Sequence, residues 1–132
     1  MGYRSDVYAA IEFVDEGACD AWLVAAKLRS DASKWSSMFG HGERSEDGRL
    51  VIIKHESVKW YDDFEDVRFF METLEWTHAG FDCGYRFLRI GEEMDDVEED
   101  IAYPEAGWND SLWDALQFYR SVDYGFDMTR SL

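Results

Sequence analysis

The chain has little of several residue types whose presence defines whole classes of protein. Its two cysteines, Cys19 and Cys83, do not make a disulfide framework, and a chain of 132 residues can bury a core without one. No apolar run approaches the roughly 18 residues of a membrane span, and the first residues lack the apolar stretch of a secretion signal. We therefore expect a protein of the reducing cell interior, with a cytoplasmic location.

Proline is also rare, with a single residue in the chain. No stretch rich in Pro, Gly or Ser marks a linker, and no internal repeat is present. We therefore expect one domain over residues 1–132. Within it, residues 1–91 form an α+β core, and residues 92–132 form an acidic edge strand and a C-terminal helix.

Positive charge is scarce as well. The chain holds 13 Lys and Arg against 29 Asp and Glu, a formal net charge of −16, and no Lys or Arg follows Arg89 until Arg120. Binding to a nucleic acid backbone needs Lys and Arg to replace counterions, and anionic lipid repels a negative surface. We expect no direct contact with nucleic acid or membrane.

Apolar and aromatic residues, in contrast, are plentiful, at 46% and 17% of the chain. This is too much apolar material for a disordered acidic chain. The protein should therefore fold, although its like charges repel one another in any compact state.

Hydrophobic periodicity predicts the first elements. Residues 5–14 alternate as in a half-buried strand, and Asp15 can cap a helix whose packing stripe is Ala18, Trp22, Ala25 and Leu28. The sequence EDG at 46–48 is typical of a hairpin turn. It predicts a strand near 37–45 that pairs with a long strand over 49–61, which has room for a bulge near Glu56 and Ser57.

The pattern over residues 62–80 predicts a second helix. Asp62 with Glu65 has the spacing of a capping box, and Gly80 suits a left-handed helix end. The expected packing stripe comprises Phe64, Val67, Met71, Leu74 and His78. Residues 83–91 then read as a strand, with Leu88 and Ile90 on one face.

The resulting order, βαββαβ, predicts an α+β protein of ferredoxin-like type, with an antiparallel sheet and two helices on one face. Residues 97–103, VEEDIAY, suggest a fifth strand at the edge of the sheet. Residues 109–122, NDSLWDALQFYRSV, predict an acidic C-terminal helix.

Three stretches together resemble a group of small uncharacterised bacteriophage and prophage proteins. They are MGYRSDV at the start, VKWYDDFEDV at 58–67 and FLRIGEEMDDVEE at 87–99. The resemblance implies a phage origin and a shared fold, and it implies no catalytic residues. The tail from Tyr103 onward lies outside it.

The acidic run after Arg89 is open to three interpretations. A calcium loop needs fixed alternate oxygen positions and a turn glycine, which EEMDDVEEDIAYPE lacks, so we expect no metal site and no cofactor. The run is either a solvated strand edge kept soluble by its charge or a surface that meets a basic partner. For the second case, the expected contact residues are Asp95, Asp96, Glu98, Glu99, Asp100 and Asp110. Trp108 and Trp113 either serve as aromatic anchors for the partner or pack the tail onto the body.

Signals for catalysis are weak. No phosphate loop, HExxH or GxSxG pattern occurs, so we expect no catalytic residues and not an enzyme. One alternative is a small enzyme or ligand-binding domain with a pocket near His41, His55 and Tyr61. Another is a homo-oligomeric phage accessory protein, for example a homodimer.

The leading hypothesis is therefore a non-enzymatic acidic phage protein. It would bind a basic host protein that handles nucleic acid or takes part in defence, and inhibit or modulate it. Carboxylates on a rigid scaffold can enter a groove built for a phosphate backbone, which is the logic of nucleic-acid mimicry.

Overall fold

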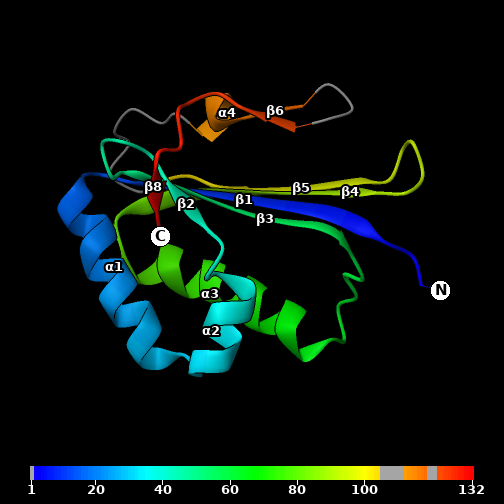
Figure 1. Cartoon of the computed structure of the whole chain (residues 1–132), viewed down its shortest axis with the longest axis horizontal. Coiled ribbons are helices and arrows are strands. Elements are labelled where there is room, and N and C mark those ends of the chain that lie inside the picture. Colours follow the sequence, from blue (N-terminus) through cyan, green and yellow to red (C-terminus); the bar gives the residue numbers. More distant parts are fainter. Residues whose placement is uncertain (1, 105–111, 119–121) are drawn as a thin grey trace.

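The computed structural model describes residues 2–104, 112–118 and 122–132, and it has three layers. A six-stranded antiparallel sheet lies in the middle, with helices on one side and a short C-terminal layer on the other (Figure 1). The strand order is β5-β4-β1-β3-β2-β8, and a separate two-stranded sheet, β6-β7, belongs to the C-terminal layer. The bounds are β1 Ser5–Phe13, α1 Glu16–Arg29, α2 Ala32–Met38, β2 Glu43–Arg44, β3 Leu50–Val58, α3 Glu65–Gly80, β4 Cys83–Gly91, β5 Val97–Ala102, α4 Leu112–Ala115, β6 Leu116–Phe118, β7 Val122–Tyr124 and β8 Arg130–Ser131.

Strand β1 is the centre of the sheet, paired with β3 on one side and β4 on the other. Its predicted alternation is confirmed, because Ile11 and Phe13 face the helices while Tyr8 and Ala10 face the C-terminal layer. The strand is buried on both faces and not half-buried as predicted, since α4, β6 and β7 cover the face that the sequence left to solvent.

The two long helices begin and end close to the predicted residues. Helix α3 buries Val67 and Leu74 of its predicted stripe, whereas α1 turns a partly different face to the core. In α1, Asp15 caps the helix by accepting from the Ala18 amide at 2.8 Å, as predicted. The buried residues, however, are Cys19, Trp22 and Ala26, and Leu28 is 82% exposed. The predicted stripe is confirmed at Trp22 and in part at Ala18, which packs against the core, and it is wrong at Leu28.

In α3 the predicted caps are wrong. Phe64 is the N-cap and makes no side-chain cap hydrogen bond, and Gly80 does not adopt positive φ. The buried face includes Thr73 and Thr77, whose hydroxyls donate to backbone carbonyls one turn earlier. Thr77 also accepts from the Trp22 indole at 2.8 Å. Because these hydroxyls are satisfied inside the fold, threonine can occupy core positions that a search for apolar residues misses.

The predicted strand near residues 37–45 is mostly wrong. Residues 32–38 form α2, capped by Asp31, and only Glu43–Arg44 pair with β3. Trp35 stacks on Phe39, which stacks on Phe70 of α3, with ring centroids 4.9 and 4.8 Å apart. This aromatic packing favours a helix over Ala32–Met38. The predicted hairpin turn at 46–48 is confirmed.

At that turn, Gly48 has φ of 77°, which the hairpin requires and glycine tolerates. The bulge in β3 is also confirmed. Ser5 pairs with Val58 but Val7 pairs with His55, so one extra residue is accommodated, and Ser57 adopts φ of 52° there.

The prediction of an α+β fold with an antiparallel sheet is confirmed, and so is the edge strand, which is β5. The four-stranded βαββαβ description does not match the strand order, because β5 and β8 extend the sheet and α2 is inserted after α1. Within its described part, the predicted C-terminal helix is confirmed over Leu112–Ala115 and wrong from Leu116 onward. Helix α4 ends at Ala115 and β6 follows at once, because Leu112 and Leu116 are buried against Tyr8 and other side chains of the sheet.

Within the residues that the structure describes, none of the helices combines the length and apolar character needed to cross a membrane.

Leu116 provides a test of the C-terminal layer. It is 1% exposed, so Leu116→Ala should lower the free energy of unfolding by about 2–5 kcal/mol through lost burial and a residual cavity. The matched control is Leu28→Ala on the outer face of α1, which should change it by less than about 0.5 kcal/mol. Urea denaturation measures both, and equal effects would show that the layer does not pack as described.

Candidate partner-binding surface

The acidic run forms the turn and second strand of the β4-β5 hairpin. Arg89 lies opposite Glu98, and Leu88 lies opposite Glu99. The turn is closed by the Gly91 amide, which donates to the Asp96 carbonyl at 2.8 Å. The hairpin therefore places acidic side chains of β5 beside basic side chains of β4.

Arg89 holds two of these carboxylates. Its Nη2 is 2.8 Å from Asp96 Oδ1, and its Nε is 2.9 Å from Glu98 Oε1. Arg89 also donates to the Ser5 hydroxyl at 3.1 Å, which ties the hairpin to the start of β1. The guanidinium is largely buried, so these charge-assisted hydrogen bonds are less screened than pairs on the open surface.

Tyr3 fastens the same turn from the N-terminal side. Its hydroxyl donates to Asp96 Oδ2 at 2.6 Å and accepts from the Glu93 amide at 3.0 Å, while its own amide donates to the Tyr61 hydroxyl at 2.8 Å. Hydrogen bonds from Arg89 first, and from Tyr3 second, hold the pKa of Asp96 below its usual value. The turn is thus fixed to β1 and to the β3-α3 loop.

The next two carboxylates of the run lie on opposite faces of β5. Glu99 accepts from Arg86 Nε at 2.6 Å on the side of the C-terminal layer. Asp100 accepts from the Tyr85 hydroxyl at 2.9 Å on the helix side, and burial followed by this hydrogen bond raises the pKa of Tyr85. The run is consequently divided between the two faces of the sheet.

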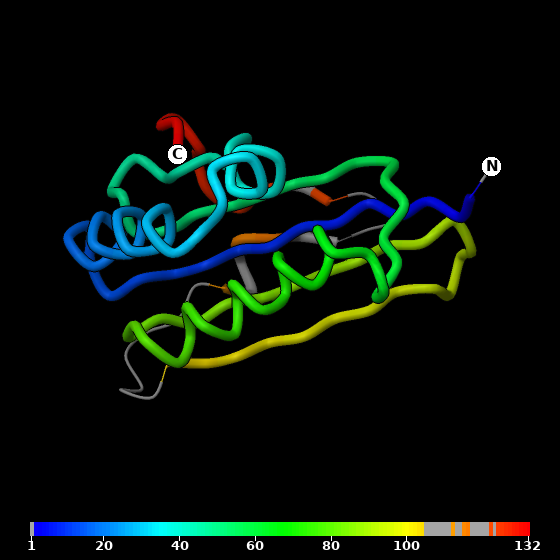
Figure 2. The backbone as a smooth tube through the Cα atoms, turned by 90° about the horizontal axis from the view of Figure 1, so that it is seen from below, coloured from blue at the N-terminus to red at the C-terminus, as the bar shows by residue number. Residues whose placement is uncertain are grey.

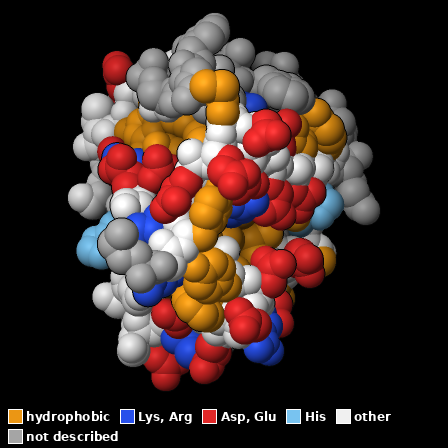
Figure 3. Space-filling model, turned by 90° about the vertical axis from the view of Figure 1, so that its right-hand side faces the viewer, with side chains coloured by type: hydrophobic (Ala, Val, Ile, Leu, Met, Phe, Trp, Pro, Cys, Tyr) orange, Lys and Arg blue, Asp and Glu red, His pale blue; other side chains and the backbone are white. Residues whose placement is uncertain are grey.

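One end of the molecule carries several carboxylates without an ion pair. Six exposed ones, which we call the acidic end, have no salt bridge to any described residue: Asp62, Asp63 and Asp66 around the start of α3, and Glu92, Glu93 and Asp95 in the β4-β5 turn. Figure 3 looks onto this end and shows acidic side chains around small hydrophobic areas.

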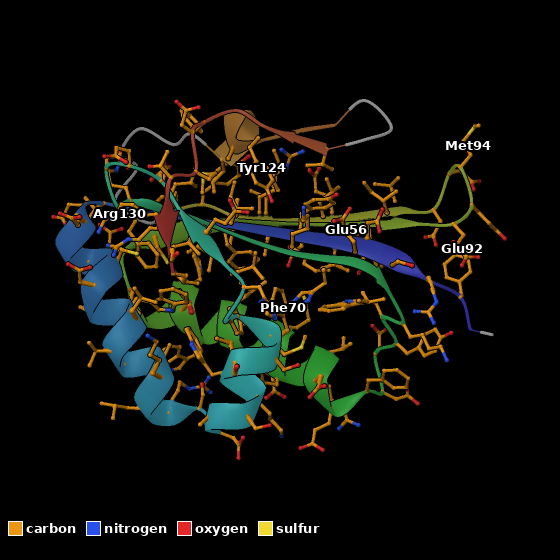
Figure 4. All side chains as sticks on the ribbon, in the orientation of Figure 1. Glu56, Phe70, Glu92, Met94, Tyr124 and Arg130 are labelled. Atoms are coloured by element: carbon orange, nitrogen blue, oxygen red, sulfur yellow. The ribbon has the colours of Figure 1, made fainter. Side chains whose placement is uncertain are left out.

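Two apolar side chains project among these charges. Met94 is 78% exposed and Phe64 is 41% exposed. Met94 and Glu92 extend from the hairpin turn, at the far end of the molecule from Arg130 (Figure 4). Phe64 packs edge-on against Tyr61, at a centroid distance of 5.0 Å. The acidic end therefore offers apolar contact points within a negative surface.

The predicted contact residues have different environments. Asp95 is exposed at the acidic end, whereas Asp96, Glu98, Glu99 and Asp100 each have a partner on β4 or at the N-terminus. Trp113 belongs to α4, while Trp108 and Asp110 lie outside the described residues.

Sequence reasoning missed the partners of the acidic run. Arg86, Arg89 and Tyr85 could have been found by folding YRFLR onto VEEDIA as a hairpin, since alternation and register determine which side chains meet. No comparable sequence pattern indicates the contact between Tyr3 and Asp96, because it depends on tertiary structure.

The residues of the alternative pocket lie apart. His41 lines a hollow of about 310 Å³ between the α2-β2 loop and residues 128–131, and neither His55 nor Tyr61 lines it. His55 makes a 2.9 Å hydrogen bond to the Met38 carbonyl and stacks on Trp60. The hydroxyl of Tyr61 is occupied by the Tyr3 amide.

The remaining chemistry-bearing groups are buried or scattered. Burial raises the pKa of the Cys19 thiol to about 11 and that of Cys83 to about 12, so neither is a ready nucleophile. Among the described residues, no three His, Cys, Asp or Glu side chains are grouped so as to hold a metal ion.

Comparison with protein-family models, with curated proteins and with solved structures finds no match to this chain. Any assignment of function therefore depends on the geometry described above.

The Asp96 interactions predict a pH-dependent stability. A carboxyl whose folded pKa is lowered stabilises the fold above its unfolded pKa of about 3.9, and this contribution is lost as pH falls through the folded value. Asp96→Asn should therefore lower the free energy of unfolding at about pH 7, and the difference from the unmodified protein should shrink by about pH 3.

Asp95→Asn is the matched control, because Asp95 is exposed in the same turn and has no salt bridge to a described residue. Urea titration at both pH values measures the two variants. If Asp96→Asn had the same small effect at both pH values as Asp95→Asn, the Arg89 and Tyr3 contacts would not stabilise the fold.

Proposed function

We propose that the protein is a non-enzymatic binding protein whose acidic end meets a basic surface on a partner protein. The observation that carries this proposal is the set of exposed carboxylates without ion pairs on two turns that Tyr3 and Arg89 tie together. Ordering mobile groups on binding costs conformational entropy, and contacts that hold the two turns in place before binding lower that cost.

The physical basis of recognition is charge steering followed by apolar contact. A net charge of −16 attracts a basic partner over about a Debye length, roughly 8–10 Å at physiological salt. On contact, Met94 and Phe64 can enter apolar depressions on the partner. Methionine suits such a role because its flexible, polarisable side chain adapts to irregular surfaces.

The resemblance to bacteriophage proteins supports a partner in the infected bacterium. Proteins that handle nucleic acid present basic grooves, and a rigid array of carboxylates can occupy such a groove in place of phosphates. The partner is then a host nuclease, defence effector or transcription factor, which the protein inhibits or modulates in the cytoplasm.

For the fold, we propose a ferredoxin-like origin of the four central strands. The chain order β1, α1, β2, β3, α3, β4 supports it, since this is the βαββαβ order once α2 is set aside. The edge strands β5 and β8 and the C-terminal layer are then later additions.

Affinity capture from a bacterial lysate tests the proposed function. The unmodified protein should retain basic, nucleic-acid-binding proteins at about 50 mM salt and release most of them at about 500 mM, because salt screens exposed charges. The triple variant Glu92→Gln, Glu93→Gln, Asp95→Asn should retain at least about fivefold less, since rim charges chiefly govern electrostatic association.

The matched control removes the same charge from residues outside the acidic end, with Glu72→Gln, Glu75→Gln and Asp127→Asn, all of which are exposed. Quantitative mass spectrometry compares the three captures. Equal retention by both triple variants would mean that the acidic end is not the binding surface.

A further inference from the structure

Strand β5 presents an unpaired edge of the six-stranded sheet. It pairs with β4 on one side only, and Figure 2 shows it, in yellow, along the outer rim with no described segment outside it. In an antiparallel pair, residues alternate between bonding the neighbouring strand and pointing their backbone groups away from it. The free edge of β5 therefore carries a defined set of backbone donors and acceptors.

The register identifies those groups. Because the Gly91 amide donates to the Asp96 carbonyl, Asp96, Glu98 and Asp100 point their backbone groups toward β4. Val97, Glu99 and Ile101 point theirs outward. The Val97 amide is taken up by the Asp95 carbonyl at 3.1 Å, whereas the amides and carbonyls of Glu99 and Ile101 have no partner among the described residues.

Acidic side chains lie on both faces of this edge, and two of them already have a cation on β4, Glu98 with Arg89 and Glu99 with Arg86. Glu98, Glu99 and Asp100 are all exposed, with Glu98 and Asp100 on the helix side and Glu99 on the other. The whole hairpin, from Cys83 to Tyr103, contains seven acidic residues and two arginines. An incoming strand therefore meets backbone groups flanked by net negative charge.

This charge selects among possible occupants of the edge. A second copy of the chain pairing antiparallel through β5 would bring the acidic side chains of both strands directly opposite one another, and like charges in that arrangement are destabilising. Acidic edges commonly prevent self-association of sheets for this reason. A strand rich in Lys and Arg has the opposite sign and satisfies both the backbone and the side chains.

We propose that the β5 edge binds an extended, Lys/Arg-rich segment of the partner protein by strand addition. Backbone hydrogen bonds to Glu99 and Ile101 hold the segment, and Glu98, Glu99 and Asp100 select its basic side chains. The inference rests on the proposed function, because it assigns a second contact with the same basic partner. Strand addition would place the partner segment in a fixed register along β5, which charge attraction alone does not do.

A pair of synthetic peptides tests strand addition. One is an extended peptide of about eight residues, mostly Lys and Thr, long enough to cover one strand. The other has the same sequence and charge but carries N-methyl groups on all of its backbone amides, so that neither edge of the peptide can donate to β5. Fluorescence anisotropy should give an affinity at least about tenfold lower for the methylated peptide, since it loses its ladder of hydrogen bonds.

Amide hydrogen exchange by NMR locates the contact on the protein. Without peptide, the amides of Glu99 and Ile101 should exchange fast while those of Glu98 and Asp100 are protected by β4. With the unmethylated peptide, exchange at Glu99 and Ile101 should slow by at least about tenfold, and exchange at Glu98 and Asp100 should change little.

A variant of the edge complements the peptides. Ile101→Pro removes one outward amide and keeps the inward bonds to β4, as proline is tolerated on the outer side of an edge strand. It should weaken peptide binding by about tenfold, whereas the matched Ile101→Val should stay within about twofold. Circular dichroism confirms that each variant is folded.

Three results would overturn the inference. The first is equal affinity for methylated and unmethylated peptides, which would leave charge attraction, and so the proposed function, intact. The second is no binding of the unmethylated peptide or no slowing at Glu99 and Ile101. The third is protection of these two amides that rises with protein concentration alone, which would identify a second copy as the occupant. Failure of the proposed function is a separate result, seen as equal lysate capture by the two triple variants.

Discussion

The contacts of Arg89 with Asp96 and Glu98 are the interaction on which the arrangement of the acidic hairpin depends. One guanidinium, held by the Ser5 hydroxyl, neutralises part of the charge of two carboxylates and fixes the turn between β4 and β5. The remaining carboxylates of the turn then have a defined position next to those at the start of α3. Without Arg89, Arg86 alone would remain in the hairpin to offset the repulsion among its acidic residues.

The core supplies the stability that a chain of this charge needs. The central strands are covered by helices on one face and by the C-terminal layer on the other, so nearly all of β1 is buried. Trp22, Phe39 and Phe70 form one core, and Leu112 and Leu116 contribute to the second. Burial of apolar area on both faces offsets self-repulsion, which is why the acidic residues can be kept at the rim without unfolding the chain.

Local patterns predicted the parts of the fold that local forces decide. The alternation of β1, the Asp15 cap, the turn at Gly48 and the edge strand β5 all follow from short-range rules, and each is confirmed. Helix α2 was missed because stacking between Trp35, Phe39 and Phe70 joins elements distant in sequence.

Contacts between elements distant in sequence also explain why the C-terminal layer and the candidate site were predicted only in part. Leu112 and Leu116 fit a helical spacing, yet burial against the sheet and pairing with β7 convert the second half to a strand. For the site, the sequence located the acidic hairpin but not its internal ion pairs, which depend on register. The other half of the acidic end, at Asp62, Asp63 and Asp66, could not be linked to the hairpin, because Tyr3 and Tyr61 join the two only in three dimensions.

The central claim is that the negative charges of the β4-β5 turn are held in a fixed position by Arg89 and Tyr3. NMR relaxation measures this directly, as backbone order parameters for residues 92–96. The account predicts values of about 0.8 or higher, similar to those of the adjoining strands. Values below about 0.6, typical of a flexible loop, would contradict it.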